Sequence, residues 1–325
     1  MNPRAVIDCR LMSDRIRERE HVPDRELRGI LPVLQIPFTA GHPVDTIDEA
    51  ALRREVEFCI ACGVHGLVLP ALASEFMVLT DDERRFVVET VVTQTAGRVP
   101  VVANVAAPSA NAAIVFACHA REHGADAVMA LPPYVRRPTM DAVLNYYAAI
   151  AEAARLPVVI QNAPPPFGIS LPTPIVLRLV DEIEGVSYIK EERSPAGRLM
   201  SEALAAGSPR LRGILGGSAG LYLPGELRRG AIGCMPSAAV GDVLVAVYDA
   251  FMAGDTVAAR AIHRRALPLL TLEMSAMMAV SKEVLRRRGI FTSTLMRDPE
   301  FAPLDAGDLA ELDAIWPDLA PLFAV

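Results

Sequence analysis

The chain alternates eight times between short apolar segments and amphipathic segments across residues 29–253. The apolar segments are rich in Val, Ile and Leu, and this is typical of parallel strands that helices cover on both faces. Eight strand–helix units predict an α/β fold, the (β/α)₈ TIM barrel. The strands are expected at 29–38, 66–70, 99–105, 127–131, 157–161, 186–190, 211–215 and 231–235.

Helical spacing of apolar residues fills the intervals between these strands. Thr80 and Glu83 form a capping-box pattern at the start of one helix. A doubly wound open sheet is the alternative fold, but it usually has a glycine-rich turn after its first strand, and residues 37–41 do not match one. The helices are expected at 45–62, from 80 onward, and at 110–123, 139–155, 172–183, 195–206, 218–229 and 240–253.

The chain is predicted to have three parts. Residues 1–26 include a mixed charge run and lack the apolar stretch of a signal peptide, so an N-terminal arm is expected there. Residues 27–254 form the barrel. Residues 255–325 are expected to form C-terminal helices packed on the barrel, including helices at 255–272 and 305–319.

Charge and hydropathy narrow the classes of partner. The 325-residue chain has a net charge of −7, which disfavours nucleic acids and anionic membrane surfaces. No run of 18 apolar residues is present, so no membrane span is expected. Five scattered cysteines favour a reducing cytoplasm over a disulfide framework.

Two short patterns resemble metal or redox motifs. Cys59 and Cys62 form a C-x-x-C pattern, but it lies inside a predicted helix and has no second cysteine pair. His119 and His123 are four residues apart and can share a helix face, yet no H-E-x-x-H motif accompanies them. A solvated helix face is the preferred interpretation of the two histidines, and no metal site is predicted.

In TIM barrels the functional residues gather at the carboxyl ends of the strands. Lys190 ends the strand predicted at 186–190, and the only other lysine in the sequence is Lys282. Burial disfavours the charged ammonium, so a neutral amine that attacks a ketone to form a Schiff base is expected. Most lysines are solvated, so by itself Lys190 more often reads as a strand-end residue that reaches water.

Other strand ends supply possible partners for Lys190. Tyr134 is the only tyrosine at a predicted strand end, where it is either a proton shuttle or a packed aromatic residue. Glu192 lies two residues after Lys190, and the period of a strand puts both side chains on one side. Glu192 is thus either a proton-transfer or hydroxyl-binding group, or a surface glutamate. Gly216 and Gly217 permit close approach by a ligand.

These strand ends resemble those of the dihydrodipicolinate synthase / N-acetylneuraminate lyase superfamily of class I aldolases. The similarity runs from about Leu27 to about Leu295. The resemblance implies that Lys190 is the Schiff-base nucleophile and Tyr134 a proton relay. The shared motifs are Pro37-Phe38, the turn at Glu75, Pro133-Tyr134, Asn162-x-Pro164, Ile189-Lys190-Glu191 and Gly216-Gly217. The predicted site comprises Lys190, Tyr134 and Glu192 as catalytic residues and Ala73, Ser74, Glu75, Asn162, Gly217 and Met235 as substrate-binding residues.

Two departures from the family pattern bear on the substrate. The loop at residues 71–75 lacks both threonines of the synthase, and Pro165-Pro166 occupies the place of its carboxylate-binding arginine. A role in lysine biosynthesis is therefore not expected. Residues 74–84, 129–134 and 161–164, with the glutamate two positions after the lysine, are instead similar to 2-keto-3-deoxy-L-arabonate dehydratase-like members.

The resemblance implies a Schiff-base lyase that dehydrates a 2-keto-3-deoxy sugar acid in the cytoplasm. A pyruvate-dependent class I aldolase and a non-catalytic 2-keto acid sensor are the alternatives. No cofactor is expected, because the lysine itself supplies the electron sink. The expected partner is a small 2-keto acid, without nucleic acid or membrane, and family membership implies a homotetramer.

Overall fold

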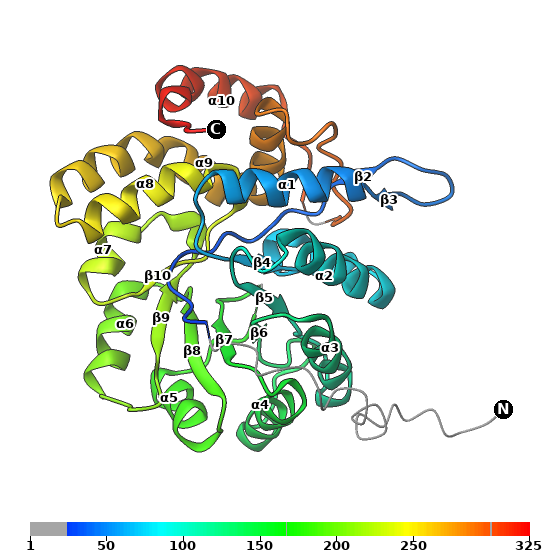
Figure 1. The fold of residues 1–325 in the computed structure, drawn as a ribbon, viewed down its shortest axis with the longest axis vertical. Helices are drawn as coiled ribbons and strands as arrows, with labels where there is room; N and C mark the ends of the chain where they lie inside the picture. The colour runs from blue at the N-terminus through cyan, green and yellow to red at the C-terminus, as the bar shows by residue number, and fades with distance from the viewer. Residues whose placement is uncertain (1–24, 167, 300) are drawn as a thin grey trace.

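A computed structural model of the protein describes residues 25–166, 168–299 and 301–325. Eight parallel strands lie in the order β1-β10-β9-β8-β7-β6-β5-β4 (Figure 1). The TIM-barrel-like fold predicted from the alternation is confirmed. The strands are β1 (Gly29–Ile30), β4 (Leu67–Leu69), β5 (Val101–Asn104), β6 (Ala127–Ala130), β7 (Val158–Asn162), β8 (Val186–Glu191), β9 (Gly213–Gly216) and β10 (Gly233–Cys234).

Val33 closes the sheet into a barrel. It forms parallel bridges to Val68 in β4 on one side and to Ser237, just after β10, on the other. Leu34 N donates to Val68 O at 3.0 Å, and Val68 N donates to Pro32 O at 2.9 Å. The prolines at 32 and 37 lack an N–H, which is why this edge of the sheet is joined by short segments and not by one long strand.

Helices surround the strands on the outside (Figure 1). The capping box predicted at Thr80 is confirmed: its side chain accepts from Glu83 N, and Glu83 reaches back to the Thr80 backbone. The helices are α1 (Glu49–Ala61), α2 (Asp81–Thr95), α3 (Ala110–His123), α4 (Met140–Ala154), α5 (Thr173–Glu182), α6 (Ala196–Ala205), α7 (Leu223–Arg228), α8 (Gly241–Met252), α9 (Thr256–Arg287) and α10 (Ala306–Leu319).

A hairpin precedes α1, where the sequence pattern predicts an earlier helix start. Strands β2 (Phe38–Thr39) and β3 (Thr46–Ile47) pair antiparallel. The side chain of Asp45 accepts from Gly41 N within the hairpin, and Asp48 is the residue that caps α1. The helix predicted to start at residue 45 therefore begins at Glu49, because the acid at position 45 is used to close a turn.

The barrel interior is filled by side chains that alternate along the strands. Val102, Met129, Val159 and Tyr188 belong to one buried apolar cluster inside the barrel. Tyr188 is two residues before Lys190, so the pleat directs Lys190 to the same interior face, one layer nearer the carboxyl end. The strand register thus sets where the lysine amine lies.

The C-terminal helices rest on this framework. Helix α9 packs against α8 and also contacts the short 3₁₀ segment at Leu72–Ser74 that follows β4. It runs 32 residues through Pro268 and has a non-helical residue at Met277, so it extends well beyond the helix predicted at 255–272. The three-part division of the chain stays a prediction, and all of the proposed N-terminal arm except its last two residues lies outside the described residues.

None of the helices in the described part of the chain combines the length and apolar character that a membrane crossing requires. Cys59, Cys62 and Cys234 are buried free thiols. Cys118 is disulfide-bonded, which the scattered cysteine pattern did not predict.

Candidate active site

Lys190 lies near the end of β8, a six-residue strand that is buried throughout. Its Cα pairs with Gln161 of β7 and with Leu215 of β9, so neighbouring strands hold it on both sides. Only 5% of its side chain is exposed. The buried amine predicted from the sequence is therefore present, and it does not extend into solvent.

Glu192 lies beside this amine. Its Oε1 is 3.1 Å from Lys190 Nζ, which confirms that the two side chains fall on the same side of the strand. Gln161 Nε2 donates to Glu192 Oε2 at 2.9 Å. One carboxylate oxygen is thus fixed by an amide while the other faces the amine, an arrangement suited to passing a proton to or from groups attached to the lysine nitrogen.

Gly217 leaves the space that Glu192 occupies. A Cβ atom built on Gly217 would lie 2.4 Å from Glu192 Oε1 and 2.5 Å from its Cγ. The glycine was predicted to permit close approach by a substrate. Its position shows a different use of the missing side chain, which is to admit the carboxylate next to Lys190.

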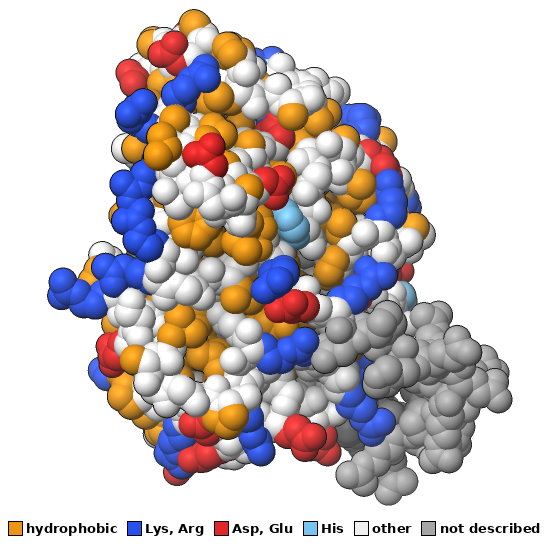
Figure 2. Space-filling view, turned by 60° about the vertical axis from the view of Figure 1, so that its left-hand side comes forward, with side chains coloured by type: hydrophobic (Ala, Val, Ile, Leu, Met, Phe, Trp, Pro, Cys, Tyr) orange, Lys and Arg blue, Asp and Glu red, His pale blue; other side chains and the backbone are white. Residues whose placement is uncertain are grey.

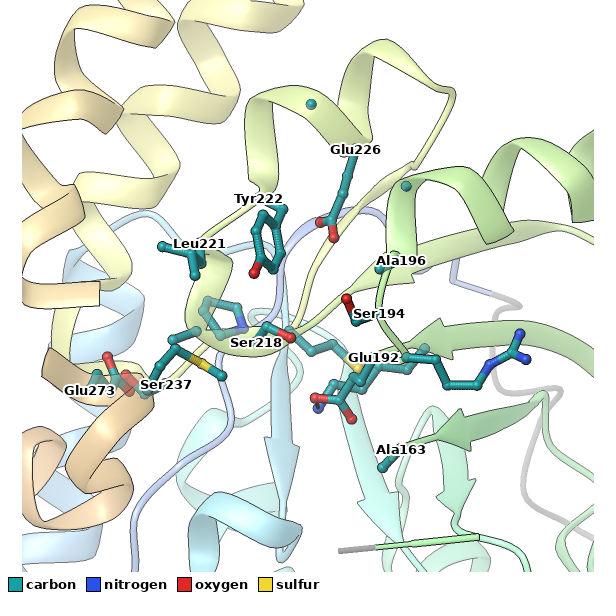
Figure 3. A pocket seen from close by; sticks show the side chains of 18 of the residues that line it. Ala163, Glu192, Ser194, Ala196, Ser218, Leu221, Tyr222, Glu226, Ser237 and Glu273 are labelled. Atoms are coloured by element: carbon teal, nitrogen blue, oxygen red, sulfur yellow. Dashed lines mark ion pairs between the residues drawn. The ribbon is translucent and has the colours of Figure 1, made fainter. Parts of the chain in front are cut away.

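Lys190 and Glu192 line a pocket of about 1010 Å³ at the carboxyl end of the barrel. Ala73 and Met235, both predicted to bind substrate, line the same pocket. Figure 3 shows the labelled hydroxyl side chains of Ser194, Ser218 and Tyr222 between the Glu192 side of the pocket and α7. The pocket is large enough for a small ligand, since binding cavities typically range from about 300 to 1,000 Å³.

The remaining wall of the pocket comes from α9. Met274, Met277 and Met278 lie on it, together with His263 and Glu273. Glu273 is buried, which raises the pKa of its carboxyl, while Ser237 and Ser281 oppose this rise by hydrogen bonding. A helix outside the eight strand–helix units therefore completes the cavity, and no strand-end inventory identifies it.

A second carboxyl in the pocket, Glu226 of α7, was not identified from the sequence. Its side chain is 1% exposed, and neither carboxyl oxygen has a hydrogen-bond partner among the described residues. Burial and the charge of Glu192 raise the pKa of Glu226 to about 8. One signal was available, since an acid within the apolar Leu-Tyr-Leu-Pro-Gly-Glu run is unusual for a residue that only packs.

Tyr134 is half-buried after β6 and packs edge-on against Phe76, with ring centroids 5.9 Å apart. Burial raises the pKa of the Tyr134 phenol, and the nearby Arg84 opposes the rise. Tyr134 is not among the described residues that line the pocket. Its predicted pairing with Lys190 therefore stays a prediction.

Three predicted substrate-binding residues have their polar groups bonded within the protein. Ser74 Oγ donates to Leu34 O. Asn162 Nδ2 donates to Leu171 O, and Asn162 Oδ1 accepts from Leu171 N. Glu75 Oε1 pairs with Lys282 Nζ at 2.5 Å, and its Oε2 accepts from Arg297 N and Asp298 N. Substrate contacts of these three side chains stay predictions. Both carboxylate oxygens of Glu75 already bind groups in α9 or in the segment that follows it.

The histidines predicted to face solvent lie on α3 against α2. Side-chain exposure is 11% for His119 and 39% for His123, and the rings approach Glu89 Oε1 at 2.8 and 3.5 Å. Potential ligand atoms of Glu89, His119 and His123 lie within 4.8 Å of one another. Hydrogen bonding between these side chains accounts for the arrangement, so the expectation that this is not a metal site stays a prediction.

Comparison with known proteins identifies the family. The family model described as the dihydrodipicolinate synthetase family matches residues 26–316. The chain belongs to this family. Its enzymes are aldolases and dehydratases, and the protein is accordingly a lyase.

Two curated relatives represent different activities within the family. L-2-keto-3-deoxyarabonate dehydratase of Azospirillum brasilense is 31% identical over 91% of the chain and 95% of the relative. The 4-hydroxy-tetrahydrodipicolinate synthase of Agrobacterium fabrum is 33% identical over 74% of the chain and 81% of the relative. The chain is about equally similar to the dehydratase and to the synthase, at 31% and 33% identity. These identities establish the family but do not distinguish between the two substrates.

Solved structures agree with the fold. A putative dihydrodipicolinate synthetase from Pseudomonas aeruginosa superposes with a TM-score of 0.84 at 27% identity, covering 91% of the chain and all of that protein. YagE, a prophage protein of the family from Escherichia coli K12 solved in complex with pyruvate, gives a TM-score of 0.83 at 25% identity, covering 91% and 99%. The family thus includes a member that binds a 2-keto acid.

Proposed function

We propose that the protein is a Schiff-base dehydratase that acts on a 2-keto-3-deoxy sugar acid. The observation that carries this proposal is the buried Lys190 amine 3.1 Å from the Glu192 carboxylate at one end of a large pocket. An amine kept from water is the nucleophile that such chemistry needs, and an adjacent carboxylate supplies the proton transfers.

The proposed reaction begins with attack of the neutral Lys190 amine on the C2 ketone. Loss of water gives a protonated imine, which withdraws electrons and makes the C3 hydrogen acidic. Glu192 removes that proton to form an enamine, and the enamine electrons then expel the C4 hydroxyl. The remaining imine then isomerises: it loses a C5 hydrogen and the C5 hydroxyl hydrogen and gains a proton at C3 and at C4, so the alcohol at C5 becomes an aldehyde. Hydrolysis of that imine frees Lys190, and a five-carbon substrate thus yields 2-oxoglutarate semialdehyde.

One feature favours dehydration over condensation with a second aldehyde, because the 71–75 loop lacks the synthase threonines. A pyruvate-releasing aldolase is the second candidate, supported by the pyruvate complex of YagE.

The decisive test is a product-resolved assay with five- and six-carbon 2-keto-3-deoxy acids. We expect a semialdehyde product that a coupled dehydrogenase oxidises, and no pyruvate. Pyruvate release without semialdehyde would replace the dehydratase by the aldolase. Absence of any product with all of the acids would favour the 2-keto acid sensor.

The predicted nucleophile has a built-in control because the sequence holds only two lysines. Borohydride reduction in the presence of a 2-keto acid should add one substrate-derived mass to the peptide that contains Lys190. Lys282 is fully buried in its ion pair with Glu75 and should carry no adduct. The variant Lys190→Arg should lose both adduct and activity, and an adduct on Lys282 would contradict the assignment.

We also propose a cytoplasmic homotetramer. The family resemblance and the buried free thiols Cys59, Cys62 and Cys234 support this, whereas the disulfide at Cys118 does not. Sedimentation velocity of the purified protein tests the assembly, and a monomer at assay concentration would refute it. A thiol count on protein purified without reductant tests the redox environment.

A further inference from the structure

Glu226 has no role in the scheme above, yet it lies in the same pocket as Lys190 and Glu192. It projects from the short helix α7 toward the cavity (Figure 3). Both of its carboxyl oxygens are buried without a hydrogen-bond partner in the described part of the chain. A buried polar group left unpaired costs about 1–3 kcal/mol, so a bound ligand that supplies a partner would relieve this cost.

The end of β9 makes room for the two carboxyls, one on each face of the strand. A Cβ built on Gly216 would lie 2.0 Å from Glu226 Oε2, and the corresponding atom on Gly217 would lie 2.4 Å from Glu192 Oε1. Consecutive glycines therefore make room for two acids from different elements. This explains the Gly-Gly pair better than backbone contact with a ligand does.

The buried Cys234 thiol of β10 lies near Glu226, Glu192 and Lys190, whose charges affect its pKa. Burial raises its pKa, the charges of Glu226 and Glu192 raise it further, and the charge of Lys190 lowers it. All three groups are thus near one sulfur atom.

The two acids differ in their surroundings. Glu192 has the Lys190 amine and the Gln161 amide as partners. Glu226 has no hydrogen-bond partner among the described residues, and burial with the charge of Glu192 raises its pKa to about 8. Two carboxyls in such different surroundings can serve as base and acid in one reaction.

We propose that Glu226 is the acid that protonates the departing C4 hydroxyl of the substrate. The proposal rests on the dehydratase function above and assigns a step that the scheme leaves open. In this step the C2=C3 enamine electrons form a C3=C4 double bond, and the C4–O bond breaks. The oxygen leaves with the Glu226 proton as water, and Glu226 is left as a carboxylate. The C3 proton held by Glu192 returns through solvent, so one water is lost overall.

The test compares the wild type with Glu226→Gln, which keeps the shape and hydrogen-bond donor but has no transferable proton. We expect kcat for water loss to fall about a hundredfold or more while KM changes little. Borohydride trapping at Lys190 and exchange of the C3 hydrogen with deuterated solvent should persist, because both precede the step assigned to Glu226.

A substrate whose leaving group needs no proton isolates that step. In the 4-fluoro analogue of the 2-keto-3-deoxy acid, fluoride departs as an anion. Wild type and Glu226→Gln should release fluoride at rates within about threefold of each other, since general acid catalysis acts only on the poor leaving group. Equal defects with both substrates would overturn the proposal.

Two further variants guard against a misleading result. Glu55→Gln changes a buried carboxyl of raised pKa that bonds to Gln35 N outside this pocket, and it should leave kcat unchanged. Gly216→Ala keeps Glu226 but forces its carboxyl away, and it should reproduce the slow water loss with normal fluoride release. The Gly216 variant provides the test if Glu226→Gln does not fold.

The possible failures are distinct. If the wild type dehydrates no sugar acid, the proposed function falls and the role of Glu226 falls with it. If the wild type dehydrates but Glu226→Gln keeps its kcat, only the role of Glu226 is refuted. A rise in KM with unchanged kcat would make Glu226 a ligand of a substrate hydroxyl and would also refute the acid role.

Discussion

Gly217 has no side chain, and the space that a methyl group would fill holds the carboxylate of Glu192. The three nearest atoms that a new Cβ would meet, Oε1, Cγ and Cδ, all belong to the Glu192 side chain and none to the backbone, so a change of the Glu192 rotamer can relieve the contact. The same movement would take its carboxylate from Lys190. A substitution of Gly217 is therefore expected to lower activity more than it lowers the stability of the fold.

We therefore expect Gly217→Ala to fold with nearly wild-type stability while kcat falls tenfold to about a hundredfold, the usual cost of misplacing a catalytic group by about 1 Å. Circular-dichroism melts and steady-state kinetics measure the two effects. Combining Gly217→Ala with Glu192→Gln should cost no more than the worse single change, since both remove one function. Full activity of Gly217→Ala would show that the position of Glu192 is unimportant.

Residue identity allowed part of the site to be predicted. Lys190 and Glu192 were identified because strand ends and strand period fix their place and direction. Glu226 was missed because its importance comes from burial without a hydrogen-bond partner in the described part of the chain, and the apolar run before it indicates burial but not the missing partner. For Ser74, Glu75 and Asn162 the sequence placed polar groups near the site but did not show that bonds within the protein already use them.

Among the elements, α9 has the largest effect on the site because it supplies one wall of the pocket and is tied to the barrel by a buried ion pair. Lys282 Nζ pairs with Glu75 at 2.5 Å, donates to Leu295 O at 2.8 Å and lies 4.4 Å from the centre of the Phe38 ring. The pair connects α9 to the turn that follows β4. Packing of this helix thus depends on two charges that water does not reach.

Replacing only one member of the Lys282–Glu75 ion pair should lower the free energy of unfolding more than replacing both members. Lys282→Met leaves the Glu75 carboxylate buried without its cation, which typically costs about 3–5 kcal/mol of unfolding free energy. Adding Glu75→Gln should restore part of that loss. Urea unfolding of the wild type, both single variants and the double variant forms the cycle. Additive effects would mean that the ion pair contributes no coupling.

Sequence periodicity located the elements well and their ends less well. The predicted strand–helix alternation was confirmed because every unit has an apolar strand and a helix with one apolar face. The hairpin β2–β3 was missed because each of its strands is only two residues long. The predicted end of α9 was too early because the helix continues past the non-helical residue at Met277. These are features that tertiary contacts decide.

The whole molecule carries a net charge of −7, but the mouth of the pocket is basic. Figure 2 brings the α6–α8 side forward and shows basic side chains running down one edge. Arg198, Arg260 and Arg264 are exposed residues that line the pocket. Such a local field attracts small anions even when the overall charge repels them.

This distribution predicts that kcat/KM for a sugar acid falls severalfold as salt rises to about 0.3 M, where screening acts over a few ångströms. Arg264→Gln should lower kcat/KM at low salt and flatten the salt dependence, with kcat unchanged. Arg210→Gln, exposed and just before β9 at the other end of the barrel, is the matched control. An identical salt dependence in Arg264→Gln and wild type would exclude steering by this residue.

The shortage of lysines has a practical consequence for anyone handling the protein. Both of its side-chain amines lie inside, 4% and 0% exposed, so acylating dyes and amine cross-linkers find no lysine on the outer surface. Loss of activity on treatment with such a reagent would then report entry into the cavity, and an added 2-keto acid should shield the enzyme.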